Sequence, residues 1–194
     1  MKLHKTSRVN EARAQSIQVI SFVAGGVRMA FDIDHLRGIV AGAGNQPASR
    51  LPKYVTGAML VNGSAVPVID LGARLGLSDA DAGGPNAKRV VIVCAGRHVA
   101  GLAVDAVSEI AWLKLHDLDI ARCSPMERID RSYIRGIGCK GSRICRPDSA
   151  FAVLEVTRIL DRCADSLSAA RASLELASHP AAVVKQTRHS RRAA

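Results

Sequence analysis

Histidine and cysteine, the side chains that most often carry out chemistry, are few in this chain and do not form a recognisable site. The six histidines stand at positions 4, 35, 98, 116, 179 and 189, and three of these lie near the two ends of the chain. A nucleophile needs a general base within hydrogen-bond reach and a third group that orients the base. The spacing offers no such set, so we predict no catalytic residues and no enzymatic activity.

The five cysteines stand at positions 94, 123, 139, 145 and 163, and none belongs to a Cys-x-x-Cys pair. An odd number without paired spacing favours reduced thiols over a disulfide framework, and no nearby histidine completes a zinc site. The glycine-rich stretches AGAGN and GGVRMAF lack the spacing of phosphate-binding loops. We therefore predict no metal and no cofactor, and keep a redox- or metal-responsive cysteine protein as an alternative.

The chain has 194 residues and a formal net charge of +10, with 27 basic and 17 acidic residues. Residues 1–16 contribute +3, residues 161–194 contribute +3, and residues 122–146 hold seven basic residues against two acidic ones. Proteins that bind single-stranded nucleic acid usually combine such charge with stacking aromatic residues, which are only 3% of this chain. We expect no nucleic-acid partner, and a basic β-barrel nucleic-acid-binding module stays as the alternative function.

The composition, 48% hydrophobic and 23% charged, is that of an ordinary globular protein. No apolar run approaches the roughly 18 residues of a membrane span, and the first residues lack the apolar segment of a secretory signal. We expect a cytoplasmic protein without direct membrane insertion.

Short apolar segments rich in valine and isoleucine, each bounded by Gly, Asn or Pro, predict β-strands. They are IQVISFV, VRMAFDI, YVTGAMLV, AVPVIDL, VVIVCA and VAGLAVDAV. After them, apolar residues recur every three or four positions from Ile159 to Leu174. This period predicts a C-terminal helix from about 157 to 177 that packs on a barrel.

The strand region also repeats itself. A shift of 71 positions aligns residues 23–39 with residues 94–110, and a shift of 79 aligns the Tyr-x-x-Gly motif at 54–57 with that at 133–136. Each copy contains four or five short strands, and closing such strands into a small barrel removes their open edges. We therefore predict a mainly β protein with two linked small β-barrels and a C-terminal helix.

These patterns divide the chain into four parts. We expect a flexible basic arm at residues 1–16, the two β-barrel subdomains at 17–161, the C-terminal helix at 162–179 and a mobile basic tail at 180–194.

Four ordered segments resemble the CheW family of bacterial chemotaxis coupling proteins. They are FDIDHLRGI, VNGSAVPVIDLGARLGL at 61–77, RVVIVCAGRHVAGLAVDAVSEI at 89–110, and YIRGIG, and the resemblance that they carry covers about residues 17–161. The resemblance implies two five-stranded β-barrel subdomains without enzymatic activity. It further implies a cytoplasmic scaffold that joins the cytoplasmic tips of chemoreceptors to the regulatory domain of a histidine kinase, with array self-association.

The resemblance also implies two sets of functional positions. A receptor-binding groove between the subdomains would contain Leu36, Ile39, Gly101, Val107, Ile110 and Gly136. For each apolar member, ordinary barrel core is the competing interpretation. A fold and turn motif would contain Gly57, Asn62, Gly63, Pro67 and Asp70.

Two departures from the family pattern bear on partner binding. Asn62 stands where the family commonly has an arginine, so a long cation able to hold a partner is lost. Residues 140–151 are longer and more basic than the usual turn, which could alter kinase pairing at that edge. The resemblance implies a chemotaxis-like pathway but does not select flagellar or pilus motility or another output.

Overall fold

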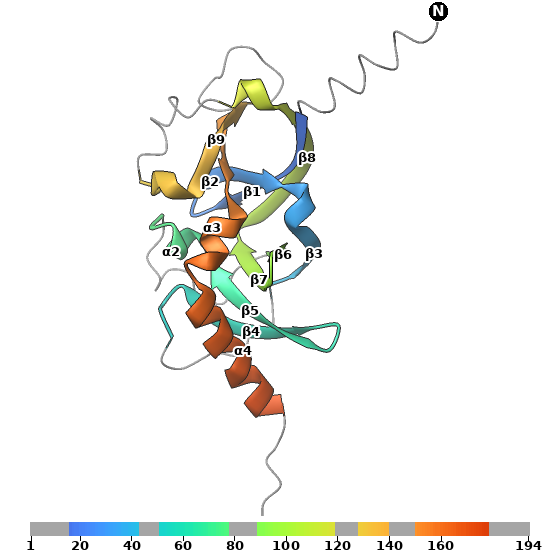
Figure 1. The fold of residues 1–194 in the computed structure, drawn as a ribbon, viewed down its shortest axis with the longest axis vertical. Helices are drawn as coiled ribbons and strands as arrows, with labels where there is room; N and C mark the ends of the chain where they lie inside the picture. Colours follow the sequence, from blue (N-terminus) through green and yellow to red (C-terminus); the bar gives the residue numbers. More distant parts are fainter. Residues whose placement is uncertain (1–15, 43–50, 78–88, 119–127, 140–149, 179–194) are drawn as a thin grey trace, which may run out of the picture.

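The computed structural model describes residues 16–42, 51–77, 89–118, 128–139 and 150–178. They form two five-stranded sheets stacked along the long axis of the molecule (Figure 1). Sheet A has the strand order β8-β1-β2-β10-β9, and sheet B has the order β3-β6-β7-β5-β4. The mainly β fold with two five-stranded subdomains is therefore confirmed.

Sheet A consists of β1 (Ser16–Ala24), β2 (Val27–Asp32), β8 (Ala106–Lys114), β9 (Ile134–Cys139) and β10 (Ala150–Leu154). Sheet B consists of β3 (Leu36–Ala41), β4 (Val55–Val61), β5 (Ser64–Asp70), β6 (Arg89–Ala95) and β7 (His98–Val104). Short 3-10 turns are η1 (Ile33–His35), η2 (Leu115–Asp117) and η4 (Arg131–Tyr133), and the helices are α2 (Leu71–Arg74), α3 (Val156–Asp161) and α4 (Ala164–Ser178).

The two copies of the repeat exchange strands instead of each forming its own barrel. The first copy, β1 to β5, places two strands in sheet A and three in sheet B, and the second copy, β6 to β10, does the reverse. The β1–β2 hairpin corresponds to the β6–β7 hairpin, and each hairpin pairs in parallel with the last strand of the other copy. The repeat is thus real, but our picture of one barrel per copy is wrong because the chain crosses between sheets after η1.

Each sheet curves without closing. Figure 1 shows sheet A bent round on itself, yet β8 and β9 stand at opposite ends of its hydrogen-bonded order. The same holds for β3 and β4 in sheet B, within the part of the chain that the structure describes. Among the described residues each barrel therefore has a seam, and β3 and β8 are edge strands of their sheets, as β4 and β9 are.

Side chains point alternately to the two faces of each strand, and they form three hydrophobic clusters. Side chains on the concave faces form one small cluster in each sheet, around Val19 in sheet A and Val90 in sheet B. Side chains on the opposite faces, such as Ile20 and Val91, form one large cluster between the sheets. Because neighbouring residues of a strand point to opposite faces, residues next in sequence enter different cores.

The C-terminal helical stripe is broken into two helices. Helix α3 ends at Asp161, and α4 begins at Ala164 after a turn in which the Cys163 N–H donates to the Leu160 carbonyl at 3.0 Å. Helix α3 packs between the sheets, and α4 lies along β4 and β5 (Figure 1). The turn lets Ile159, Leu160, Cys163 and Leu167 all reach the large cluster while the axis changes direction.

The predicted basic arm and basic tail lie outside the described residues, apart from Ser16. Among the described helices, none combines the length and the apolar character needed to cross a bilayer.

Candidate functional site

The candidate site is an apolar edge of the core between the two sheets. Leu36 and Ile39 on β3 lie opposite Val93 and Val91 of β6, whose side chains belong to the large cluster. A side chain and its cross-strand partner point to the same face of a sheet. The β3 side chains therefore point toward the core between the sheets, from the outermost strand of sheet B.

Strand β8 repeats this arrangement in sheet A. Val107 lies opposite Phe22, and Ile110 lies opposite Ile20, both of which belong to the same large cluster. Leu36 and Val107 are half-buried against that cluster, whereas 44% of Ile39 and 52% of Ile110 is exposed. We call these four residues, Leu36, Ile39, Val107 and Ile110, the junction surface.

The local register of β8 is held by a serine, Ser21, which no motif or spacing in the sequence marks as functional. The ladder between β1 and β8 shifts between Ile20 and Phe22, and Ser21 occupies the irregular position. The Ser21 hydroxyl donates to the Glu109 carbonyl at 2.9 Å and accepts from the Glu109 N–H at 3.2 Å. Its side chain thus replaces the missing ladder contact and fixes where Val107 and Ile110 fall.

The two glycines expected in the groove lie elsewhere. Gly101 is buried in β7, and a Cβ there would come within 2.5 Å of Val90 in the concave core of sheet B. Gly136 is buried in β9, and a Cβ there would meet Leu118 at 3.0 Å. Both positions serve close packing inside their sheets and are not part of the junction surface.

The turn motif is built around the β4–β5 hairpin. Asn62 and Gly63 have φ angles of 49° and 78°, and positive φ at both central residues is the pattern of a type I′ turn. Asparagine tolerates this left-handed conformation better than arginine does, which gives the departure at position 62 a structural reason.

The other motif residues lie along the same two strands. Gly57 is buried at a register shift in β4, and Pro67 precedes the first β5–β7 pair at Val68, so its missing N–H costs no contact in that ladder. The Asp70 carboxylate caps α2 by accepting from the Ala73 N–H at 2.8 Å.

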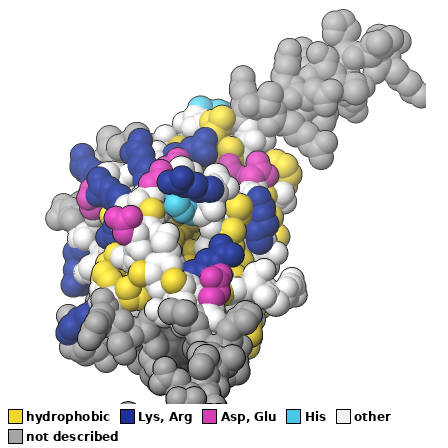
Figure 2. Space-filling model, turned by 60° about the horizontal axis from the view of Figure 1, so that its bottom comes forward, with side chains coloured by type: hydrophobic (Ala, Val, Ile, Leu, Met, Phe, Trp, Pro, Cys, Tyr) yellow, Lys and Arg dark blue, Asp and Glu magenta, His cyan; other side chains and the backbone are white. Residues whose placement is uncertain are grey.

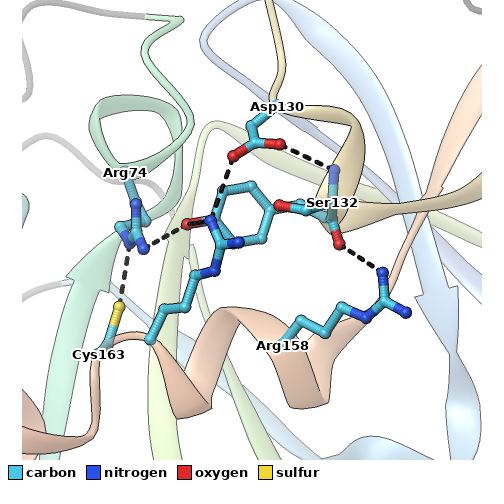
Figure 3. Close-up of polar contacts among 7 residues, drawn as sticks. Arg74, Asp130, Ser132, Arg158 and Cys163 are labelled. Atoms are coloured by element: carbon cyan, nitrogen blue, oxygen red, sulfur yellow. Dashed lines mark hydrogen bonds and ion pairs between the residues drawn. The ribbon is translucent and has the colours of Figure 1, made fainter.

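A second feature, which no sequence motif indicates, joins the two sheets on the side of α3. The guanidinium of Arg74 lies 5.1 Å from the centroid of the Tyr54 ring and 5.0 Å from that of the Tyr133 ring. Its Nε donates to Cys163 Sγ at 3.0 Å, and its Nη2 donates to the Tyr133 hydroxyl (Figure 3). The two tyrosines are the matched residues of the repeat, so one arginine connects both copies.

Two further arginines contact the η4 turn that ends at Tyr133. Arg162 lies 5.0 Å from the ring centroid and donates to Asp130 at 3.2 Å, and Arg158 donates to the Ser132 carbonyl at 3.1 Å (Figure 3). The Asp130 carboxylate accepts from the Ser132 N–H, and this bond, with Arg162 adding to it, holds the pKa of Asp130 below its ordinary value. The arginines therefore have structural partners here and are not an isolated basic patch.

On the face shown in Figure 2, arginine and lysine side chains are scattered among acidic and apolar ones. Among the residues that the structure describes, the basic side chains form no continuous stripe on this face.

The described residues assemble no group of three or more His, Cys, Asp or Glu side chains able to hold a metal ion. Cys94 and Cys163 are free, whereas Cys139 is disulfide-bonded. The expectation of reduced thiols is therefore wrong for Cys139. Sequence spacing alone does not reveal a disulfide, because the bond depends on how closely the fold brings two Cβ atoms together.

The fold and the site define a class of protein: two five-stranded sheets, each built from strands of both copies of a repeat, with apolar side chains on the edge strands β3 and β8. Residues 18–164 match the model of the CheW-like domain. The chain therefore belongs to the CheW-like family, which confirms the resemblance.

Known proteins agree with this assignment. The chain is 33% identical over 139 residues to the chemotaxis protein CheW of Rhizobium meliloti (strain 1021), covering 69% of this chain and 86% of that protein. It is 36% identical over 126 residues to a probable chemotaxis protein CheW of Rhizobium etli, covering 62% and 76% respectively. The crystal structure of the scaffolding protein TtCheW from Thermoanaerobacter tengcongensis has the same fold, with a TM-score of 0.61, 22% identity, and coverage of 74% of this chain and 87% of that one.

Proposed function

We propose that this chain is a non-catalytic scaffold of a chemotaxis-type pathway that holds a chemoreceptor tip and the regulatory domain of a histidine kinase in a fixed geometry. Membership of the CheW-like family and the names of the Rhizobium relatives support a role in chemotaxis. In this role the protein is cytoplasmic and is recruited to receptor arrays.

The junction surface is the observation that carries this proposal. Ile39 and Ile110 occupy equivalent positions of the repeat, and both are about half exposed beside a fully apolar core. Leu36 and Val107, which are also equivalent in the repeat, are half-buried against that core. An amphipathic helix can place one apolar stripe against such a surface, as in helix-in-groove recognition.

The remaining family positions support this surface indirectly. Gly101 keeps β7 packed on β6 and so fixes the strand next to β3. Gly136 allows β9 to approach Leu118, which follows β8 through η2. Substitutions at these glycines would weaken receptor binding by deforming the sheets and not by removing a direct contact.

The first prediction tests the receptor side. Ile39→Asp and Ile110→Asp place a charge where an apolar helix face would bury it, so each should weaken binding of a purified receptor-tip fragment by about 30-fold or more. Isothermal titration calorimetry at near-physiological salt measures this affinity. Leu60→Asp is the matched control, because Leu60 is 60% exposed on β4, at the opposite edge of sheet B from Ile39.

Circular dichroism and thermal unfolding of each variant show whether the fold is kept. Unchanged receptor binding by a folded Ile39→Asp protein would remove the junction surface from the proposal.

For the kinase side, titration with the isolated regulatory domain should give a saturable, stoichiometric complex. Failure to bind either partner would mean that the family likeness extends to the fold alone.

A further inference from the structure

The single tryptophan of the chain, Trp112, lies on the surface of an edge strand. It is 58% exposed, more than Ile39 or Ile110. Tryptophan carries the largest apolar surface of any side chain and is usually well buried in a protein that has no partner for it. The exposure of Trp112 on β8 therefore requires a functional explanation, and Trp112 is not among the four residues of the junction surface.

The strand register places Trp112 on the same face as the junction surface. Ile110 lies opposite Ile20 of β1, and Trp112 lies opposite Gln18, two residues further along the same ladder. Two residues along a strand correspond to about 6.6 Å, and they share one face. Trp112 thus extends the apolar surface of Ile110 along β8, beyond the core between the sheets.

The next residue on this face is charged. Lys114 is exposed and lies opposite Ser16, the first described residue of β1. The stripe therefore runs from an aliphatic residue through an aromatic residue to a cation: Ile110, Trp112 and Lys114. This order complements a helix whose apolar stripe is followed by an acidic side chain, since successive turns of a helix are about 5.4 Å apart.

We propose that Trp112 is an anchor for the receptor helix, which runs along β8 so that its apolar side chains cover Ile110 and Trp112 and an acidic side chain reaches Lys114. This inference rests on the proposed function, because it names how the same partner is held. The arguments for this occupant are the continuity of Trp112 with the junction surface and the charge at the end of the stripe. Tryptophan is among the residues that most often dominate binding energy at interfaces.

Intrinsic fluorescence tests the contact directly, because the full chain contains no other tryptophan. On titration with a tryptophan-free receptor-tip fragment, the emission maximum should shift to the blue, and quenching by acrylamide should fall as the indole leaves water. Calorimetry on the same samples gives the affinity. The titration should saturate at the same fragment concentration by both methods.

Substitutions show whether Trp112 contributes to receptor binding or is merely exposed nearby. Trp112→Ala should weaken receptor binding about tenfold or more, and Trp112→Phe should restore most of the loss because an aromatic ring remains. Leu60→Ala is the control for removing an exposed apolar side chain on a distant edge strand. Lys114→Glu should weaken binding several-fold at low salt, and the difference should shrink as salt screens the charge.

The outcomes distinguish this inference from the proposed function. If Ile39→Asp abolishes receptor binding while the fluorescence of the wild-type complex is unchanged and Trp112→Ala binds normally, the junction surface stands and the tryptophan anchor is overturned. If Trp112→Ala instead alters only self-association in analytical ultracentrifugation, the occupant is a second copy and the anchor is again overturned. If the fragment does not bind the wild-type protein at all, both proposals fail.

Discussion

Arg74 is the residue at which the two copies of the repeat meet. Its guanidinium lies between two tyrosine rings and donates to Tyr133 and to Cys163. Burial alone would lower the pKa of Arg74, but the bond to Cys163 and the facing tyrosines outweigh it and raise that pKa. The side chain is therefore a permanent cation in a partly buried aromatic setting, where cation–π contacts are stronger than at an exposed site.

Removing this cation should loosen the attachment of α3 and α4 to the sheets. Arg74→Met keeps an unbranched chain of similar length but loses both ring contacts and the hydrogen bonds. We expect the free energy of unfolding to fall by about 2 kcal/mol, which urea unfolding followed by circular dichroism measures.

Arg171→Met is the matched control for that substitution. Arg171 is exposed on α4 and pairs with Glu175 one turn later at 2.9 Å. Such an exposed pair contributes about 0.5 kcal/mol or less, so this variant should be nearly neutral. Equal losses in the two variants would show that the position of Arg74 between the tyrosines adds nothing.

At the scale of elements, the two hairpins of the repeat both begin their turn with a glycine in the left-handed conformation but differ in what that glycine touches. Gly25 in the β1–β2 turn and Gly96 in the β6–β7 turn both have a φ of 57°. A Cβ on Gly25 would lie 2.7 Å from the Cβ of Leu77, whereas a Cβ on Gly96 would meet nothing within 4 Å. The first hairpin is therefore packed on the segment that follows α2, and the second is not.

This difference can be measured with one pair of substitutions. Gly96→Ala should lower the free energy of unfolding by about 1 kcal/mol, the cost of a left-handed conformation in a residue with a Cβ. Gly25→Ala carries the same backbone cost and also forces Leu77 to move, so its loss should be about 2 kcal/mol larger. Thermal unfolding of both variants gives the comparison. Equal losses of unfolding free energy would mean that Leu77 moves aside at no cost.

The elements themselves were only partly predictable. The valine- and isoleucine-rich segments appear as β1, β2, β4, β5, β6 and β7, because their local pattern matches their environment. Strand β3 was missed because LRGIVA follows a 3-10 turn and carries a glycine, and only its pairing with β6 makes it a strand. The predicted segment 99–107 is divided at Asp105, whose carboxylate accepts from the Gly26 N–H across the molecule.

The candidate site was less predictable than the fold. Ile39 and Ile110 could be found because the repeat aligns them, but their exposure depends on which strands lie at the sheet edges. Trp112 and Arg74 gave no signal in the sequence, since their roles depend on a register and on an inter-sheet approach. The exchange of strands was also hidden, because a repeat shows that two units are alike and not which strands of each unit pair.

At the scale of the whole molecule, the exchange makes the two halves of the sequence dependent on each other. The first copy alone would leave β1 and β2 as a two-stranded hairpin and β3 separated from β4 and β5 by the missing β6 and β7. The second copy alone would separate β8 from β9 and β10 in the same way. Isolated hairpins are marginally stable in water, and here each would also expose its side of the large core.

We therefore predict that neither half folds alone and that the two halves fold together. When the chain is divided between residues 77 and 89, each fragment by itself should show no cooperative thermal transition. An equimolar mixture refolded from urea should recover the β-sheet circular dichroism of the intact protein and one cooperative transition, at a lower midpoint because association now costs entropy. That midpoint should rise with protein concentration, as mass action requires for a folded state that forms only on association. A cooperative transition in one isolated fragment would mean that its strands can pair in another order. The junction surface takes β3 from one copy and β8 from the other, and its formation would then not depend on the exchange of strands.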